Sequence, residues 1–185
     1  MKCFLITLLL LVPLVGNAAD FSKLQLDKSS ISFVSKQMGV SAEGVFKKIA
    51  AEVHFNSEKP EASLAKIDIE LASIDTGSAE SDDEVKGKSW FDVAQFPKAS
   101  FVSGSVRSLG GGKFETTGKM TLKGKTVEMH APFVLKEDKG ELNIDGVFTL
   151  KRLEFGIGSG LWSDTSVVAD EVQIKFHLVL TQISH

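Results

Sequence analysis

The stretch that decides the fold is Gly118–Thr126, which reads GKMTLKGKT. It resembles the phosphate-binding loop G-x-x-x-x-G-K-[ST], but one residue more than that motif allows separates Gly118 from Gly124. Apolar or small residues alternate with polar ones before Gly124, and the alternation resumes after it. The stretch therefore predicts two strands of a β-hairpin joined by a two-residue turn at Lys123-Gly124, and it argues against a nucleotide site.

The same alternation continues through the rest of the chain. Short alternating runs surround Phe33 and Phe55, and turn residues such as Gly110-Gly111-Gly112 separate the longer runs. The longer predicted strands are 65–71, Ala99–Leu109, Phe114–Leu122, Thr126–Leu135, Leu142–Leu150 and Val172–Leu180. Eight or more strands with short turns indicate an antiparallel barrel or sandwich. A barrel is favoured because closure leaves no exposed strand edge.

One charged segment interrupts the strand pattern. Residues 78–88 predict a single short helix, with Ser81 and Glu84 placed as a capping box. The aromatic pairs Trp90-Phe91 and Phe96-Pro97 follow directly. We expect this connection to cover one end of the barrel.

The N-terminal 19 residues have the layout of a secretory signal peptide. A short basic start precedes an apolar run from Phe4 to Val15, and small residues follow at Gly16 and Ala18. The run is shorter than the roughly 20 residues of a membrane-spanning helix. We predict cleavage before Ala19 or Asp20, a periplasmic location, and one domain over residues 20–185. The only cysteine, Cys3, lies in the predicted signal peptide, so no disulfide is expected in the mature chain.

Composition and motifs disfavour several classes of function. The 21 basic and 24 acidic residues are scattered, which argues against nucleic-acid binding, and no other segment is apolar enough to span a membrane. His54, His130 and His177 fall on the polar phase of their strands, which favours solvated histidines over a metal site. The acids at 80–84 lack the ligand order of an EF-hand, and no G-x-S-x-G is present. No catalytic residue, metal site or cofactor is predicted.

Large apolar side chains remain as the main feature of the sequence. An eight-stranded barrel can be filled by such side chains or can hold one small ligand, and periodicity does not separate the two cases.

The order of short motifs resembles that of the YceI-like family of periplasmic lipid- and polyisoprenoid-binding proteins, across essentially the whole mature chain. The residues that carry the resemblance are Phe33, Gly44-Val45-Phe46, Ser73-Ile74-Asp75-Thr76-Gly77, Trp90-Phe91-Asp92, Phe96-Pro97-Lys98-Ala99-Ser100-Phe101, Gly118–Thr126, Phe155-Gly156-Ile157-Gly158 and Ala169-Asp170-Glu171-Val172. The segment at 96–101 is similar to the family's F-P-x-A-x-F, and Gly118–Thr126 is similar to its G-x-L-T-x-x-G-x-T hairpin.

This resemblance implies an extended, lipocalin-like antiparallel barrel whose apolar lumen holds a polyprenyl chain or an isoprenoid quinone. The residues expected to line the lumen and its mouth are Phe33, Phe46, Phe55, Trp90, Phe91, Phe96, Phe101, Phe114, Met120, Phe133, Phe148, Phe155, Trp162 and Phe176. Of these, Trp90, Phe91, Phe96 and Trp162 are expected at the mouth. The competing hypotheses are an enzyme acting on a lipid inside the barrel and an envelope stress or structural protein with a filled barrel.

One departure from the family pattern bears on the ligand's head group. Many members carry Arg-Asp-x-His after the threonine-glycine pair, whereas this chain has Glu80-Ser81-Asp82-Asp83-Glu84. The departure favours a neutral head, such as a quinone, over a phosphate. Gly160–Thr165 looks like the variant of the family linked with cytochrome b561-type membrane proteins, which implies such a protein as lipid donor or acceptor. Whether the protein forms a homodimer is left open.

Overall fold

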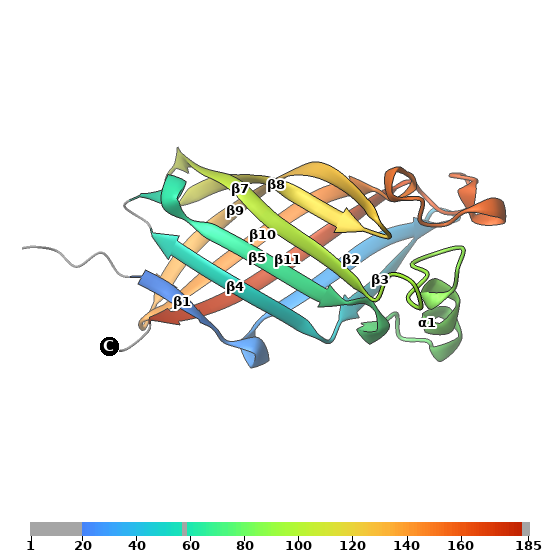
Figure 1. Ribbon diagram of the computed structural model, residues 1–185, viewed down its shortest axis with the longest axis horizontal. Coiled ribbons are helices and arrows are strands. Elements are labelled where there is room, and N and C mark those ends of the chain that lie inside the picture. Colours follow the sequence, from blue (N-terminus) through green and yellow to red (C-terminus); the bar gives the residue numbers. More distant parts are fainter. Residues whose placement is uncertain (1–19, 57–58, 183–185) are drawn as a thin grey trace, which may run out of the picture.

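A computed structural model describes residues 20–56 and 59–182 of the 185-residue chain. The predicted signal peptide, including Cys3, lies outside the described residues. The chain folds into an antiparallel barrel of eight long strands, of which the first three are interrupted (Figure 1). The strands are β1 (Asp20–Leu24) with β2 (Ser30–Gln37), β3 (Val40–Phe46) with β4 (Ile49–Asn56), β5 (Leu64–Glu70) with β6 (Ile74–Asp75), β7 (Lys98–Gly110), β8 (Lys113–Leu122), β9 (Lys125–Asp138), β10 (Glu141–Lys151) and β11 (Glu171–Gln182).

Strand neighbours follow chain order around the barrel, and the last strand closes it. β11 pairs with β1 toward one end, where Leu180 faces Leu24, and with β2 toward the other, where Ile174 faces Phe33. Every pairing between strands is antiparallel. The predicted all-β, eight-stranded antiparallel barrel is therefore confirmed.

The β8–β9 hairpin has the turn that the sequence predicts. Lys123 and Gly124 both have positive φ, 48° and 74°, as a two-residue hairpin turn requires. A Cβ at position 124 would lie 2.8 Å from the ring of Phe96, so glycine also permits the aromatic loop to pack on the turn.

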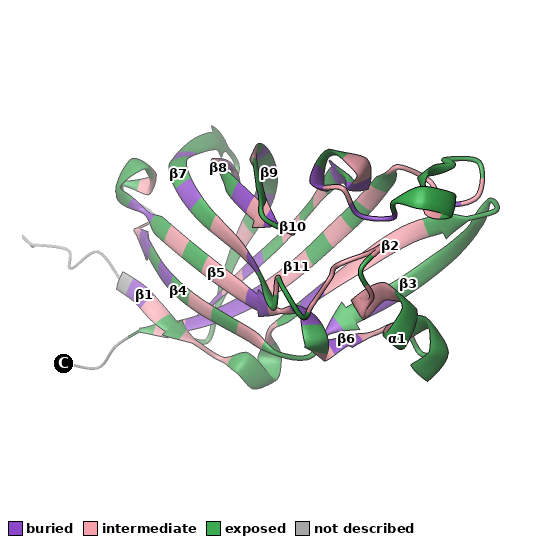
Figure 2. Ribbon diagram, turned by 45° about the vertical axis from the view of Figure 1, so that its right-hand side comes forward, coloured by how far each residue is buried: buried purple, intermediate pink, exposed green. Residues whose placement is uncertain are grey.

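Alternation along each strand divides the barrel interior from its surface. In β8 the side chains of Phe114, Thr116, Met120 and Leu122 are buried, whereas Lys119 is exposed. Two groups of buried apolar residues lie inside the barrel, one in each half. Figure 2 shows the resulting alternation of buried and exposed positions along the strands.

The one α-helix in the described part of the chain, α1 (Ala79–Lys86), confirms the helix predicted near residues 78–88. The predicted capping box at Ser81 and Glu84 is wrong. Ser78 is the N-cap, and its Oγ accepts from the backbone N–H of Ser81 at 3.4 Å. Ser81 itself lies in the first helical turn, where its side chain cannot occupy the capping position.

Five 3₁₀ helices complete the described elements: η1 (Leu26–Lys28), η2 (Pro60–Ala62), η3 (Leu71–Ser73), η4 (Arg152–Phe155) and η5 (Gly160–Ser163). Helix α1, η4 and η5 gather at the end of the barrel opposite the start of β1 and the end of β11, as Figure 1 shows. We call this end the mouth and the covering segments 79–97 and 152–168 the lid. No helix in residues 20–56 and 59–182 has the length and apolarity needed to cross a membrane.

Candidate functional site

Beneath the lid lies a cavity of about 510 Å³, here called the mouth cavity. Its walls are mostly apolar, and both lid tryptophans, Trp90 and Trp162, line it. Polar residues also line it, and they include the carboxylates Glu43, Glu80 and Glu84. Its volume falls in the range of about 300–1,000 Å³ that is typical of small-molecule sites.

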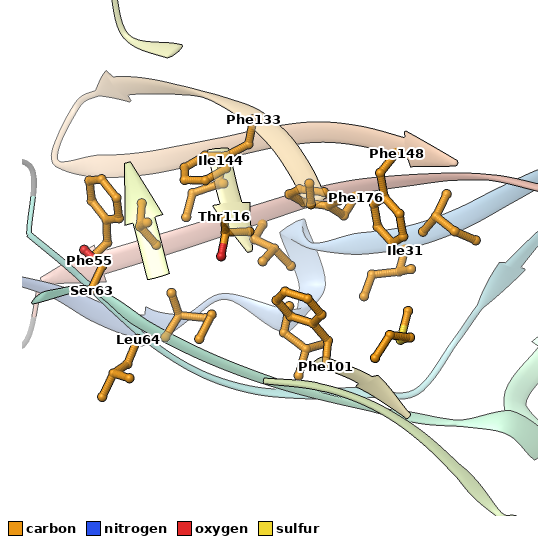
Figure 3. A pocket seen from close by; sticks show the side chains of 18 of the residues that line it. Ile31, Phe55, Ser63, Leu64, Phe101, Thr116, Phe133, Ile144, Phe148 and Phe176 are labelled. Carbon is orange, nitrogen blue, oxygen red and sulfur yellow. The ribbon is translucent and has the colours of Figure 1, made fainter. Parts of the chain in front are cut away.

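A narrower cavity of about 100 Å³, the inner cavity, continues from the mouth cavity toward the other end of the barrel. The two share five lining residues, Ile31, Ile69, Ala99, Met120 and Ile174, so they are sections of one lumen. Figure 3 shows the inner cavity, where Phe101 and Phe176 project from opposite walls. The far end is packed more tightly, and the ring of Phe55 contacts those of Phe114 and Phe133 with centroids 5.4 and 6.3 Å apart.

Eleven of the fourteen side chains predicted for the lumen and mouth line one or both cavities. In the mouth cavity these are Phe33, Phe46, Trp90, Phe91, Met120 and Trp162, and in the inner cavity they are Phe55, Phe101, Met120, Phe133, Phe148 and Phe176. Whether they contact a ligand stays a prediction.

The other three residues lie elsewhere. Phe155 is fully buried in the mouth-half core, and Phe114 is buried in the packed far end. Phe96 packs on the β8–β9 turn at Gly124. None of the three lines either lumen cavity.

The two halves of the lid are joined at the mouth by its tryptophans. Trp162 Nε1 donates to Glu84 Oε1 at 2.9 Å, which connects η5 to α1. The ring centroids of Trp90 and Trp162 are 5.4 Å apart, at a 53° tilt. Because Trp90 and Trp162 are the only tryptophans in the sequence, indole fluorescence reports on the mouth alone.

A buried arginine that sequence reasoning missed holds the second half of the lid. Arg152, 2% exposed, directs all five of its N–H groups to backbone carbonyls. Nε donates to Ala169 O, Nη1 to Ile157 O and Gly158 O, and Nη2 to Trp162 O and Val168 O, at 2.7–3.2 Å. Burial lowers the pKa of Arg152 from its ordinary value, and the nearby Asp170 carboxylate opposes the shift. With its donors occupied, Arg152 shapes the mouth but has none free for an anion.

Lys123 ties the β8–β9 turn to both parts of the lid. Its Nζ donates to Lys88 O at 3.0 Å and to Gly156 O at 2.9 Å. Burial lowers the pKa of its ammonium group, against the opposing effect of Asp92. The β8–β9 hairpin therefore also supports the mouth.

Hydrogen bonds around the start of α1 hold a carboxylate in its charged form. Asp82 Oδ1 accepts from the hydroxyl and from the backbone N–H of Thr76, both at 2.7 Å. These bonds, the one from the hydroxyl first, lower the pKa of Asp82 below its ordinary value of 3.8. They fasten the helix to the chain that leaves β6.

Ionisable groups elsewhere form surface pairs. His130 Nδ1 and Thr117 Oγ1 lie 3.1 Å apart, and His177 Nδ1 is 2.7 Å from Asp145 Oδ1. Among residues 20–56 and 59–182, no three His, Cys, Asp or Glu side chains are grouped as metal ligands would be. The lumen's charged side chains are concentrated at its mouth.

The fold and lumen define a class: a closed up-and-down β-barrel with an apolar cavity under a lid at one end. The chain belongs to the YceI-like family, because the model of the YceI-like domain matches residues 23–180. A UPF0312 protein of Pseudomonas savastanoi pv. phaseolicola is 35% identical over 147 residues, which cover 73% of this chain and 74% of that protein.

Solved structures share the fold. The crystal structure of Burkholderia cenocepacia BcnA has a TM-score of 0.84 and 46% identity, covering 86% of this chain and all of that one. A polyisoprenoid-binding domain from Saccharophagus degradans has a TM-score of 0.68 and 14% identity, covering 89% of this chain and 99% of that one. At this low identity the second comparison shows a common fold.

Proposed function

We propose that the protein is a non-enzymatic periplasmic carrier that holds the chain of an isoprenoid lipid in its barrel lumen. The observation that carries the proposal is the 510 Å³ mouth cavity and its apolar continuation past Ala99 and Met120. Each Å² of apolar ligand surface removed from water contributes about 25 cal/mol, without requiring directional contacts. The polyisoprenoid binding named for the Saccharophagus domain, within a shared fold, supports the proposal. The periplasmic location rests on the predicted signal peptide.

Charge at the mouth favours an uncharged head group, such as a quinone. The cavity is lined by the carboxylates of Glu43, Glu80 and Glu84, and Arg152, the one cation among the described residues that line it, has its N–H groups committed to carbonyls. A phosphate brought here would meet negative charge and find no free guanidinium. We further propose a cytochrome b561-type membrane protein as donor or acceptor, from the resemblance at Gly160–Thr165.

Binding is testable through the two mouth tryptophans. Titration with an isoprenoid quinone, which quenches indole emission, is expected to saturate. A polyprenol of the same chain length should displace the quinone, and the corresponding polyprenyl phosphate should do so more weakly. Absence of saturable quenching, together with no displacement by either competitor, would contradict carriage of an isoprenoid lipid.

A pair of variants on one strand separates the lumen from the surface. Ala99 lines both cavities and is 4% exposed, so Ala99→Phe should obstruct passage into the inner cavity and weaken binding of long chains more than short ones. Val102, also on β7, is 47% exposed, and Val102→Phe should leave binding unchanged. Equal effects of the two variants would contradict a lumen site. Chain-length-dependent loss in Ala99→Phe alone supports it.

A further inference from the structure

The most exposed large apolar side chains of the described residues gather at the mouth. Leu161 on η5 is 94% exposed, and Met38 and Val40 at the β2–β3 turn are 73% and 70% exposed. Figure 2 shows η5 and this turn as exposed segments at the same end of the barrel. Large apolar side chains clustered in this way on a protein surface mark an interaction site.

Both segments that carry these side chains are held in place. The backbone N–H of Met38 donates to Val167 O at 2.8 Å, which fastens the turn to the lid just after η5. Trp162, the neighbour of Leu161, is fixed by Glu84, by Arg152 and by its ring contact with Trp90. The backbone that carries the exposed apolar side chains is therefore held in place by these contacts.

Met38 and Gly39 form the two-residue turn between β2 and β3. Their φ angles of 48° and 81° resemble those of the Lys123-Gly124 turn, as a hairpin turn of this type requires. The turn places the Met38 side chain at the surface, where it is 73% exposed.

These side chains adjoin the entrance to the lumen. Gln37 and Trp162, the sequence neighbours of Met38 and Leu161, line the mouth cavity. An apolar surface that accepted Met38, Val40 and Leu161 would cover the mouth and give a lipid a path into the lumen without crossing water. A bilayer is such a surface and is also a source of lipid.

We propose that Met38, Val40 and Leu161 form a membrane-docking rim that seats the mouth on a phospholipid surface. This role rests on the proposed function, since it places the lumen against its lipid supply. The short aliphatic side chains insert shallowly, so docking is weak and reversible. The carboxylates at the mouth oppose strongly anionic surfaces and favour zwitterionic ones.

The test is flotation of the protein with phosphatidylcholine vesicles. The variant Met38→Ser/Val40→Ser/Leu161→Ser should reduce the vesicle-bound fraction at least about tenfold, because three apolar insertions are lost. Its quinone titration in vesicle-free buffer and its melting temperature should match those of the wild type. The matched control is Leu26→Ser/Leu109→Ser/Val134→Ser, which removes three side chains, 57%, 49% and 43% exposed, that lie away from the mouth and line neither lumen cavity. The control should float like the wild type.

The outcomes separate docking from lipid carriage. Failure of the wild type to float, equal flotation of the triple variant, or an equal loss in the control would overturn the docking rim. If the protein floats through these three residues but takes up no quinone, docking stands and the proposed function fails. Loss of vesicle binding in the triple variant alone, with quinone affinity unchanged, supports both.

Discussion

Replacing Arg152 tests whether one buried side chain organises the mouth. Arg152→Met keeps an unbranched apolar stem but removes the charge and five donors, so the carbonyls of Ala169, Ile157, Gly158, Trp162 and Val168 lose their partner. A buried carbonyl left without a donor costs about 1–3 kcal/mol. We expect a total loss of about 3 kcal/mol, because a loosened lid lets most of the five carbonyls reach water.

This loss is large enough to measure by thermal unfolding. A domain of this size loses about 2–4 °C in melting temperature per kcal/mol, so Arg152→Met should melt about 6–12 °C lower. Because Trp162 O accepts from Arg152 and the guanidinium lies 5.7 Å from the centroid of the Trp90 ring, indole emission should also shift to longer wavelength in the folded variant.

Two further variants serve as controls. Arg152→Lys keeps the charge but offers three donors in place of five, so its loss should be intermediate. Arg107, the other arginine in the sequence, is an exposed partner of Glu115, and Arg107→Met should cost less than about 1 kcal/mol. An Arg152→Met variant with wild-type melting temperature and wild-type emission would refute the structural role given to Arg152.

Three further predictions concern the lid and its supporting turn. Glu84→Ala removes the acceptor of Trp162 Nε1 and should cost at most about 1 kcal/mol while moving indole emission toward that of exposed tryptophan; unchanged emission would contradict the link. Gly124→Val places a β-branched residue at φ 74° against Phe96. This variant should lower the free energy of unfolding, measured by urea titration, by about 1–2 kcal/mol or more. An equal loss in Gly124→Asn would argue against backbone strain as the cause. The pKa of Asp82 is lowered in the folded state, so its contribution to stability is present above the ordinary, unfolded pKa of 3.8 and disappears as pH falls through the folded value. Asp82→Asn should therefore have a shallower loss of stability below about pH 4, and identical acid-unfolding profiles would contradict this.

The barrel could be predicted from the sequence because the patterns that specify its strands and turns extend over only a few neighbouring residues. Strand periodicity is visible in any run such as Phe114–Leu122, and the turn at Lys123-Gly124 has a two-residue signature. The interruptions in the first three strands were not predicted. They lie at η1, at residues 47–48 and at η3, where the tertiary context overrides the local strand pattern.

The site was predicted less completely for the same reason. The alternation along a strand identifies Phe101 as a residue whose side chain points into the barrel. It does not tell whether such a ring lines a cavity, as Phe101 does, or packs against another ring, as Phe114 does. Arg152 gave no signal because a basic residue at the end of a strand is usually solvated. Only the return of residues 157–169 over it brings carbonyls to its donors. The exposed rim of Met38 and Leu161 likewise emerges only from the packing of the lid.

The central claim is that the lumen holds an isoprenoid lipid, and native mass spectrometry tests it most directly. The protein would be purified without detergent from the periplasm of cells producing the full 185-residue chain. We predict a mature chain beginning at Ala19 or Asp20 that carries one isoprenoid lipid, released on collisional activation and identified by its mass. A clean ligand-free mass, with no uptake after incubation with isoprenoid quinone or polyprenol, would contradict the account and favour a filled barrel.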